Sequence, residues 1–304
     1  MTAAGSFCYN GEEEGEHMIS WKELRKLDAH IHLLPDAVHA AYPDDEDEFS
    51  WGKQSLMDSL MAEYHVERAV IMPLNDPCLM SLGGSSESVH KDLVQLKQQG
   101  GGRYLAFADV DPREDSPHAC AHLCRGILHY QLDGLKIHPA NTAIPADCPD
   151  NHYLLELAET LRIPVAVHCY PNDDHAPCAA WRVRALALAH PGLRLIVSHM
   201  GGFQWQQLLG LENIWLDLSA ILPDYVTVYG LKKTNRILRS FGTDRILFAT
   251  DYPCSRSLSP EEIYPRYMEI LDQMDFSLAE RRQIAWSNAA HLFGLEAAAG
   301  ENNG

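Results

Sequence analysis

Histidine recurs at the ends of apolar segments of this sequence, where it could ligate a metal or transfer a proton. The first such segment, LDAHIHL, places His30 and His32 two residues apart behind Asp28. Alternate side chains of an extended strand share a face, so the spacing predicts that these three point one way and the apolar residues between them the other. One such histidine is weak evidence, because most have a local or core role. The interpretation depends on which other side chains enter the same space.

Other apolar runs end in the same kinds of residue. They contribute Lys136 and His138 in GLKIHP, His168 in VAVHC, His199 in IVSHMGG and Asp251 in FATDYP. Neutral imidazoles and a carboxylate are the ligands that a divalent metal such as zinc or manganese prefers. Three or four of them around one ion, with a coordination position left open, would make a catalytic site.

Eight short apolar runs are the elements that must position these residues. They are residues 26–33, 68–74, 103–110, 132–139, 163–170, 193–200, 213–220 and 244–253. Each is almost continuously hydrophobic, as expected of strands covered on both faces. The order predicts an α/β fold with a parallel sheet, closed by its eight units into a (β/α)8 TIM barrel. Chemistry in such a barrel gathers at the C-terminal ends of the strands, where the histidines fall.

Helical periodicity fills the intervals between the runs. It predicts helices at residues 55–64, 86–100, 153–162, 179–190, 259–274 and 277–295, with a shorter one within 201–213. The helix at 259–274 begins with Ser259 as N-cap and Pro260 at the first helical position. We expect one domain over residues 18–296, a disordered extension at 1–17 and a flexible tail at 297–304. The acidic insert from Asp44 to Glu48 is expected to be a solvated loop, with a lid over the barrel mouth as the alternative.

The composition limits the kinds of partner that the protein can bind. The formal net charge of −18 repels polyphosphate, so nucleic acid is excluded as a partner. The first residues lack the pattern of a signal peptide, and no apolar span has membrane length, so we expect a cytoplasmic protein with no membrane contact. The eight cysteines lie in apolar contexts typical of reduced thiols. Cys120 and Cys124 in HACAHLC fit a plain helix better than a zinc site.

Taken together and in order, DAHIHL, GLKIHP, VAVHC, IVSHMGG, FATDYP and the closing SNAAHLFGL resemble the amidohydrolase superfamily of TIM-barrel metal enzymes. The similarity runs from Leu27 to Leu295 and is to the amidohydrolase-related branch that includes aminocarboxymuconate-semialdehyde decarboxylase. It implies that one divalent metal, zinc or alternatively manganese, is bound by four residues: His30, His32, His168 and Asp251.

The same resemblance suggests catalytic roles for Asp251 and His199. Asp251 would take a proton from a metal-activated water, and His199 would orient the water or stabilise the oxyanion; as an alternative, His199 is a ligand of a second metal. Lys136 is expected as an ammonium near the rim, paired with a carboxylate or a substrate anion. His138 is a candidate for substrate contact or for a supporting hydrogen bond. Asp28 is expected one layer deeper, supporting the site without ligating.

Two reactions fit this set of residues. Hydrolysis of a small ester, lactone or amide is favoured, and non-oxidative decarboxylation of a small carboxylic acid is the alternative. A decarboxylase needs a cation for the substrate carboxylate, for which Arg256, Arg182 and Arg184 are candidates. The acidic insert would repel such a substrate, which tilts the balance to hydrolysis. A barrel that binds metal without turnover is the third hypothesis, and a homodimer is possible.

Overall fold

The structure is a computed structural model that describes residues 19–41, 52–170, 173–254 and 258–295. Eight strands form one sheet in sequence order, each parallel to the next. They are β1 (Lys26–Ile31), β2 (Val66–Ile71), β3 (Tyr104–Asp109), β4 (Gly134–Ile137), β5 (Val165–Val167), β6 (Leu195–Val197), β7 (Ile214–Asp217) and β8 (Ile246–Leu247). A parallel bridge between Ile31 and Tyr252 closes the barrel, as does the Ala29 N–H that donates to the Phe248 carbonyl at 2.9 Å. The predicted (β/α)8 barrel is confirmed.

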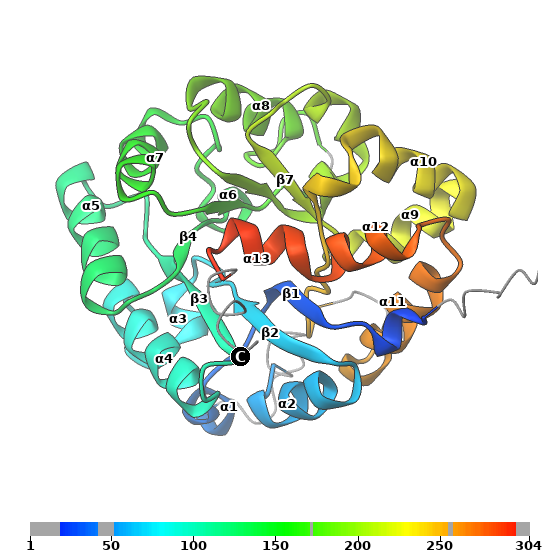
Figure 1. Ribbon diagram of the computed structural model, residues 1–304. Helices are drawn as coiled ribbons and strands as arrows, with labels where there is room; N and C mark the ends of the chain where they lie inside the picture. The colour runs from blue at the N-terminus through cyan, green and yellow to red at the C-terminus, as the bar shows by residue number, and fades with distance from the viewer. Residues whose placement is uncertain (1–18, 42–51, 171–172, 255–257, 296–304) are drawn as a thin grey trace, which may run out of the picture.

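The α-helices of the described residues mostly surround the strands in a ring (Figure 1). They are α1 (Asp36–Ala41), α2 (Gln54–Glu63), α3 (Pro77–Met80), α4 (Ser86–Gln99), α5 (Ser116–Cys124), α6 (Pro139–Thr142), α7 (Pro149–Leu161), α8 (Ala180–Ala189), α9 (Ile221–Tyr229), α10 (Leu231–Phe241), α11 (Pro260–Asp272), α12 (Leu278–Arg282) and α13 (Asn288–Leu292). Short 3-10 segments are η1 (Trp21–Glu23), η4 (Ser198–Leu208) and η5 (Thr243–Arg245), and π turns are η3 (Arg125–His129) and η6 (Gln283–Ser287).

Most predicted helices are present, and Pro260 opens α11 behind the N-cap Ser259 as expected. The short helix expected within residues 201–213 is part of η4. Between the last two strands lie α9 and α10, which the pattern does not predict. The sequence of α9, ILPDYVTVY, is rich in β-branched and aromatic residues, so its period is hard to tell from that of a strand.

The core has two layers. Inside the barrel, side chains from six of the strands form one apolar cluster: Leu27, Ala29, Val70, Met72, Leu105, Phe107, Ala166, Ile196, Leu247 and Ala249. Ala289 and Leu292 join this cluster from α13, which lies across the barrel in Figure 1 and not in the outer ring. Because the C-terminal helix covers the barrel's N-terminal end with apolar side chains, the polar residues are left to the other end.

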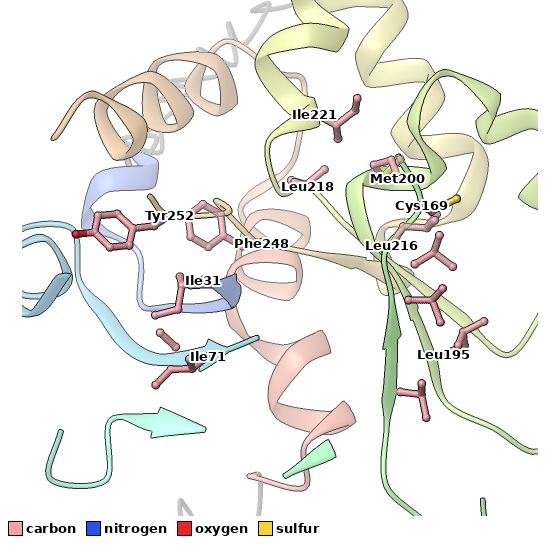
Figure 2. Close-up of a cluster of buried hydrophobic side chains, with 14 of the residues drawn as sticks. Ile31, Ile71, Cys169, Leu195, Met200, Leu216, Leu218, Ile221, Phe248 and Tyr252 are labelled. Atoms are coloured by element: carbon pink, nitrogen blue, oxygen red, sulfur yellow. The ribbon is translucent and has the colours of Figure 1, made fainter. Parts of the chain in front are cut away.

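The outer layer packs the strands against the helices, and Figure 2 shows part of it. On one side of the view Ile31 lies near Ile71 and Tyr252. On the other, Cys169 lies near Leu216, and it is 2% exposed. The alternation along β5 predicts that this cysteine points away from the barrel interior, and that prediction is confirmed.

The prediction that Asp28, His30 and His32 share one face is wrong for Asp28. Leu27 and Ala29 belong to the interior cluster, while the Asp28 carboxylate accepts a hydrogen bond from the hydroxyl of Tyr264 in α11, at 2.6 Å. The pairing of β1 with β2 shifts register between Asp28 and Ile31. Such an irregularity inserts one residue and re-aims the next side chains, so the interior side changes from Ala29 to His30.

Several expectations concern residues outside the described ranges. These are the extension at 1–17, the tail at 297–304, the acidic insert from Asp44 to Glu48, and Arg256. Within the described ranges, no helix is long and apolar enough to span a membrane.

Candidate metal centre

Three of the predicted ligands converge at the C-terminal end of the barrel. His30 and His32 end β1, and Asp251 follows β8, which β1 joins at the closure. Asp251 Oδ1 lies 3.2 Å from Nε2 of His30 and 3.2 Å from Nε2 of His32. The three residues are buried and form the one group of potential metal ligands found among the described residues.

Hydrogen bonds fix which ring nitrogens carry protons. His30 Nδ1 lies 2.9 Å from the Asp217 carboxylate, and His32 Nδ1 lies 2.7 Å from the Met72 carbonyl oxygen. Both partners can only accept, so each ring donates from Nδ1 and carries its lone pair on Nε2.

Asp251 Oδ1 is buried and has no hydrogen-bond partner among the described residues. Two lone pairs and an orphaned anionic oxygen therefore face one point. Separations of 3.2 Å match two ligands bound about 2.0–2.2 Å from one ion, so the donor set fits a divalent cation.

His168 and His199 form a second pair beside this cluster. His199 Nδ1 lies 2.9 Å from the Ser219 carbonyl oxygen, and His168 Nε2 faces the carbonyl of Tyr170. The remaining nitrogens, His199 Nε2 and His168 Nδ1, are 3.0 Å apart. With both carbonyls accepting, two lone pairs oppose each other there, and the pair needs a shared proton or a cation. The structure does not bring His168 into the three-residue group, so its role as a ligand stays a prediction.

Lys136 lies deeper than expected. It is 1% exposed, and its Nζ lies 3.3 Å from His30 Nε2 and 3.3 Å from Ser198 Oγ. Among the described residues no carboxylate lies within ion-pair distance of Nζ, so of the two expected partners the substrate anion stays a prediction. Lys136 lies this deep because it sits within β4 and points into the barrel, whereas an ammonium at the rim would have to follow the strand.

The structure also describes three other candidate residues, His138, Arg182 and Arg184. His138 stacks on His168 with 3.8 Å between ring centroids, and its Nδ1 accepts the Asn141 N–H at 3.3 Å. Arg182 pairs with Asp147, and Arg184 donates to the carbonyls of residues 207 and 209, so both guanidinium groups are engaged at helix surfaces. Contact of His138 with a substrate stays a prediction.

A cavity of about 100 Å³ opens beside the cluster. It is lined by His168, Tyr170, His199, Ala220, Ile221, Asp224, Asp251 and Cys254. Asp251 and His199, the two residues predicted to be catalytic, both line it and both have left-handed backbones, with φ of 67° and 58°. Non-glycine residues rarely adopt this conformation, and such strain clusters at active sites.

Burial shapes the protonation states at this end of the barrel. It lowers the pKa of His30 to about 4, assisted by the nearby Lys136, and it lowers the pKa of Lys136 itself to about 8. Burial also lowers the pKa of His168 well below its ordinary value. For Asp251 burial acts upward, but the charges of His30 and His199 hold its pKa at about 2. At neutral pH Asp251 is therefore a carboxylate beside the neutral rings of His30 and His168, the state that binds a metal.

Sequence reasoning missed Asp217 and Ser219, which are separated by one leucine in the run NIWLDLSA. Both are fully buried at the end of β7. The signal was available, since Asp217 is the one acidic residue in an otherwise apolar strand. Asp28 supports the site as expected, because its carboxylate accepts the His30 N–H at 3.2 Å and the Thr250 hydroxyl at 2.6 Å.

Fold and site together define a class, the (β/α)8-barrel enzymes that hold a divalent metal at the C-terminal ends of the strands. The family profile described as amidohydrolase matches residues 27–295, so the chain belongs to the amidohydrolase family. This confirms the resemblance seen in the sequence.

This chain is also similar to individual proteins, of which one is a sequence relative and two are solved structures. The gamma-resorcylate decarboxylase of Rhodococcus jostii (strain RHA1) is 31% identical over 300 residues, covering 80% of this chain and 88% of that protein. The dihydroxybenzoic acid decarboxylase of Polaromonas sp. JS666, solved with manganese and 2-nitroresorcinol, is 18% identical with a TM-score of 0.66, covering 90% of this chain and 97% of that one. A probable 2-pyrone-4,6-dicarboxylic acid hydrolase of Acinetobacter baumannii, with citric acid bound, is 17% identical with a TM-score of 0.64, covering 89% and 100%. The two solved structures support the fold alone.

Proposed function

We propose that this protein is a metal-dependent, non-oxidative decarboxylase of a hydroxylated aromatic acid. The carrying observation is the buried group of His30 Nε2, His32 Nε2 and the orphaned Asp251 Oδ1, which fits a divalent cation. The decarboxylase activity in the name of the Rhodococcus relative favours this reaction over the hydrolysis that the sequence alone favoured. A positive charge at this point also removes the objection that an acidic protein repels an anionic substrate.

The proposed metal is manganese, held by His30, His32, Asp251 and His168. Its bound form would supply a positive charge that attracts and orients a carboxylate group. Manganese replaces the zinc of the first expectation because the Polaromonas decarboxylase structure contains it, and carboxylate and imidazole ligands suit both ions.

Decarboxylation needs a proton for the ring carbon, and a residue of this chain can supply it. Decarboxylation breaks the bond between ring and carboxylate; the electron pair stays on the ring carbon, which takes a proton as carbon dioxide leaves. His199 is the proposed donor, in its doubly protonated form. Its Nδ1 keeps the proton that it donates to the Ser219 carbonyl, and Nε2, which faces His168 beside the cavity, would carry the second proton, the one that is transferred. Asp251, whose pKa of about 2 keeps it ionised, holds the metal instead.

Hydrolysis is the second candidate, because the same donor set would activate water and the Acinetobacter neighbour is named as a hydrolase. In that reaction Asp251 would act as the base. A barrel without turnover is the least favoured, since the three buried donors and the cavity are all in place.

One experiment separates the three candidates. The purified protein is loaded with Mn²⁺ and given 2,6-dihydroxybenzoate labelled with ¹³C in the carboxyl group, and in parallel 2-pyrone-4,6-dicarboxylate. Labelled carbon dioxide together with the matching arene is expected, and both should vanish in Asp251→Asn but persist in His118→Ala, a control at an exposed histidine. Ring opening of the pyrone without carbon dioxide would favour the hydrolase, and no reaction on a wider panel of aromatic acids and lactones would contradict both.

A further inference from the structure

Four hydrogen bonds converge on the carboxylate of Asp217. It ends β7 and is fully buried. Its Oδ2 lies 2.9 Å from His30 Nδ1, and its Oδ1 accepts the backbone N–H of His199 at 2.8 Å, the N–H of Ser219 at 3.2 Å and the Ser219 hydroxyl. One carboxylate therefore touches the ring of a proposed metal ligand and the backbone of the proposed proton donor.

The contact with His30 decides what that ring presents to the metal. An imidazole has two tautomers, and only the one with a proton on Nδ1 leaves a lone pair on Nε2. Asp217 accepts from Nδ1 and so selects this tautomer and holds the ring plane. Ser219 Oγ also lies 3.1 Å from Nδ1, but its hydroxyl donates to Asp217. Without the carboxylate this hydroxyl could donate to Nδ1, and the ring proton could move to Nε2, next to Lys136 and Asp251.

The contact with His199 holds a strained turn. His199, Met200 and Gly201 have φ values of 58°, 56° and 71°, so three successive residues are left-handed. A side chain at Gly201 would place its Cβ 2.4 Å from Leu208, which explains the glycine. The two non-glycine residues have a conformational cost of about 1–3 kcal/mol each. The bond from the His199 N–H to Asp217 holds the backbone of the turn to the end of β7, and the contacts of the His199 ring with Ser219 add to it.

We propose that Asp217 is a positioning residue that couples the two halves of the site, fixing His30 in its metal-binding tautomer and holding the turn that presents His199. The proposal rests on the metal site proposed above and not on the identity of the reaction. A purely structural role for Asp217 would lower stability and leave the metal affinity and the His30 tautomer of the folded protein unchanged.

The test compares Asp217→Ala with Asp109→Ala in the full chain. Asp109 is a matched control, since it is another fully buried carboxylate at a strand end, and its partners Asn75 and Ser86 lie outside the metal group. Mn²⁺ affinity is measured by titration calorimetry on protein shown to be folded by circular dichroism. We expect Asp217→Ala to bind about 10- to 100-fold more weakly than the wild type, and Asp109→Ala to bind like the wild type.

A second readout needs no metal. Long-range ¹H–¹⁵N spectra of ¹⁵N-histidine protein report the tautomer of each ring, and His30→Gln assigns the signals of His30. The wild type should show a proton on Nδ1, and Asp217→Ala a shift toward Nε2. If Asp217→Ala does not fold, Asp217→Asn can take its place in the test. Asparagine keeps the side-chain volume, but it places an amide N–H donor among groups that themselves donate.

The outcomes separate the two proposals. Unchanged affinity and tautomer in a folded Asp217 variant would overturn the positioning role. A wild type that binds no Mn²⁺ would refute the proposed function, while the tautomer would still decide for or against Asp217.

Discussion

The two ends of the barrel each bury a lysine, and the two lysines have opposite surroundings. At the N-terminal end, Lys26 Nζ donates to three backbone carbonyls, those of Trp21, Lys22 and Leu24, at 2.5–3.1 Å. At the C-terminal end, Lys136 Nζ meets one ring nitrogen and one hydroxyl. The first ammonium is fully satisfied. The second has no carboxylate within ion-pair distance among the described residues, and only the more distant charges of Asp217 and Asp251 favour its charged form and raise its pKa against the effect of burial.

The two ends of the barrel differ in how well their buried polar groups are satisfied. Around Lys26 the polar groups pair with one another, and α13 seals that end with apolar side chains. Around Lys136 lie an orphaned carboxylate oxygen, two opposed ring nitrogens and two left-handed backbones. Unsatisfied polar groups and strain are costly, and they persist where a site needs them.

The largest expected effect is at the C-terminal end. Asp251→Asn removes the anionic donor from the metal group, so we expect loss of bound Mn²⁺ and a fall in kcat of at least about 1,000-fold, equivalent to about 4 kcal/mol. Metal analysis and steady-state kinetics measure both. Stability without metal should change little or rise, because an orphaned charge is lost. A variant that kept its metal would refute the role of Asp251 as a ligand.

At the opposite end, Leu292→Ala should affect stability alone. Leu292 is 1% exposed inside the barrel cluster, so truncation leaves a cavity and should cost about 2–5 kcal/mol of unfolding free energy. Denaturant unfolding measures the cost. Mn²⁺ affinity of the folded variant should equal that of the wild type, and a marked loss would mean that the two ends are coupled.

Replacing each lysine by methionine tests the comparison directly. Lys26→Met leaves three carbonyls without their donor, so we expect a loss of about 2–4 kcal/mol in stability with metal binding unchanged. Lys136→Met removes a poorly compensated charge and should be neutral or stabilising by up to about 2 kcal/mol, with tighter Mn²⁺ binding because a neighbouring positive charge is gone. Equal destabilisation by both changes would contradict the contrast between the two ends.

Per pH unit, the smallest expected effect is the pH dependence of stability that Lys26 causes. Burial lowers its pKa from 10.5 to about 7, so between these values the unfolded chain binds more protons than the folded one. The unfolding free energy of the wild type, relative to Lys26→Met, should therefore rise with pH from about 7 to 10.5, by at most about 1.4 kcal/mol per pH unit. Urea unfolding at pH 7, 8 and 9 checks this. If the difference in unfolding free energy between the wild type and Lys26→Met did not change with pH, the three carbonyls would be keeping the ammonium charged.

Much of the barrel and part of its site were predictable from local pattern. The eight apolar runs predict the strands because both faces of a barrel strand are buried, and the motifs at their ends predict His30, His32 and Asp251. The family resemblance implied that these three residues and His168 bind one metal, and the structure brings the first three together while His168 as a ligand stays a prediction. Helix α9 was missed because its β-branched composition hides its period.

What the sequence determined by itself was the fold, the end of the barrel that carries the chemistry and the residue types available there, since hydrophobic periodicity and strand order are local properties. Tertiary structure decided the rest. The register shift in β1 turned Asp28 outward and His30 inward. The closure of the barrel, in which only β8 separates β7 from β1, brought Asp217 to His30 from 187 residues away. Lone pairs, burial and the depth of Lys136 depend on which neighbours arrive from distant segments, and no local pattern encodes those distances.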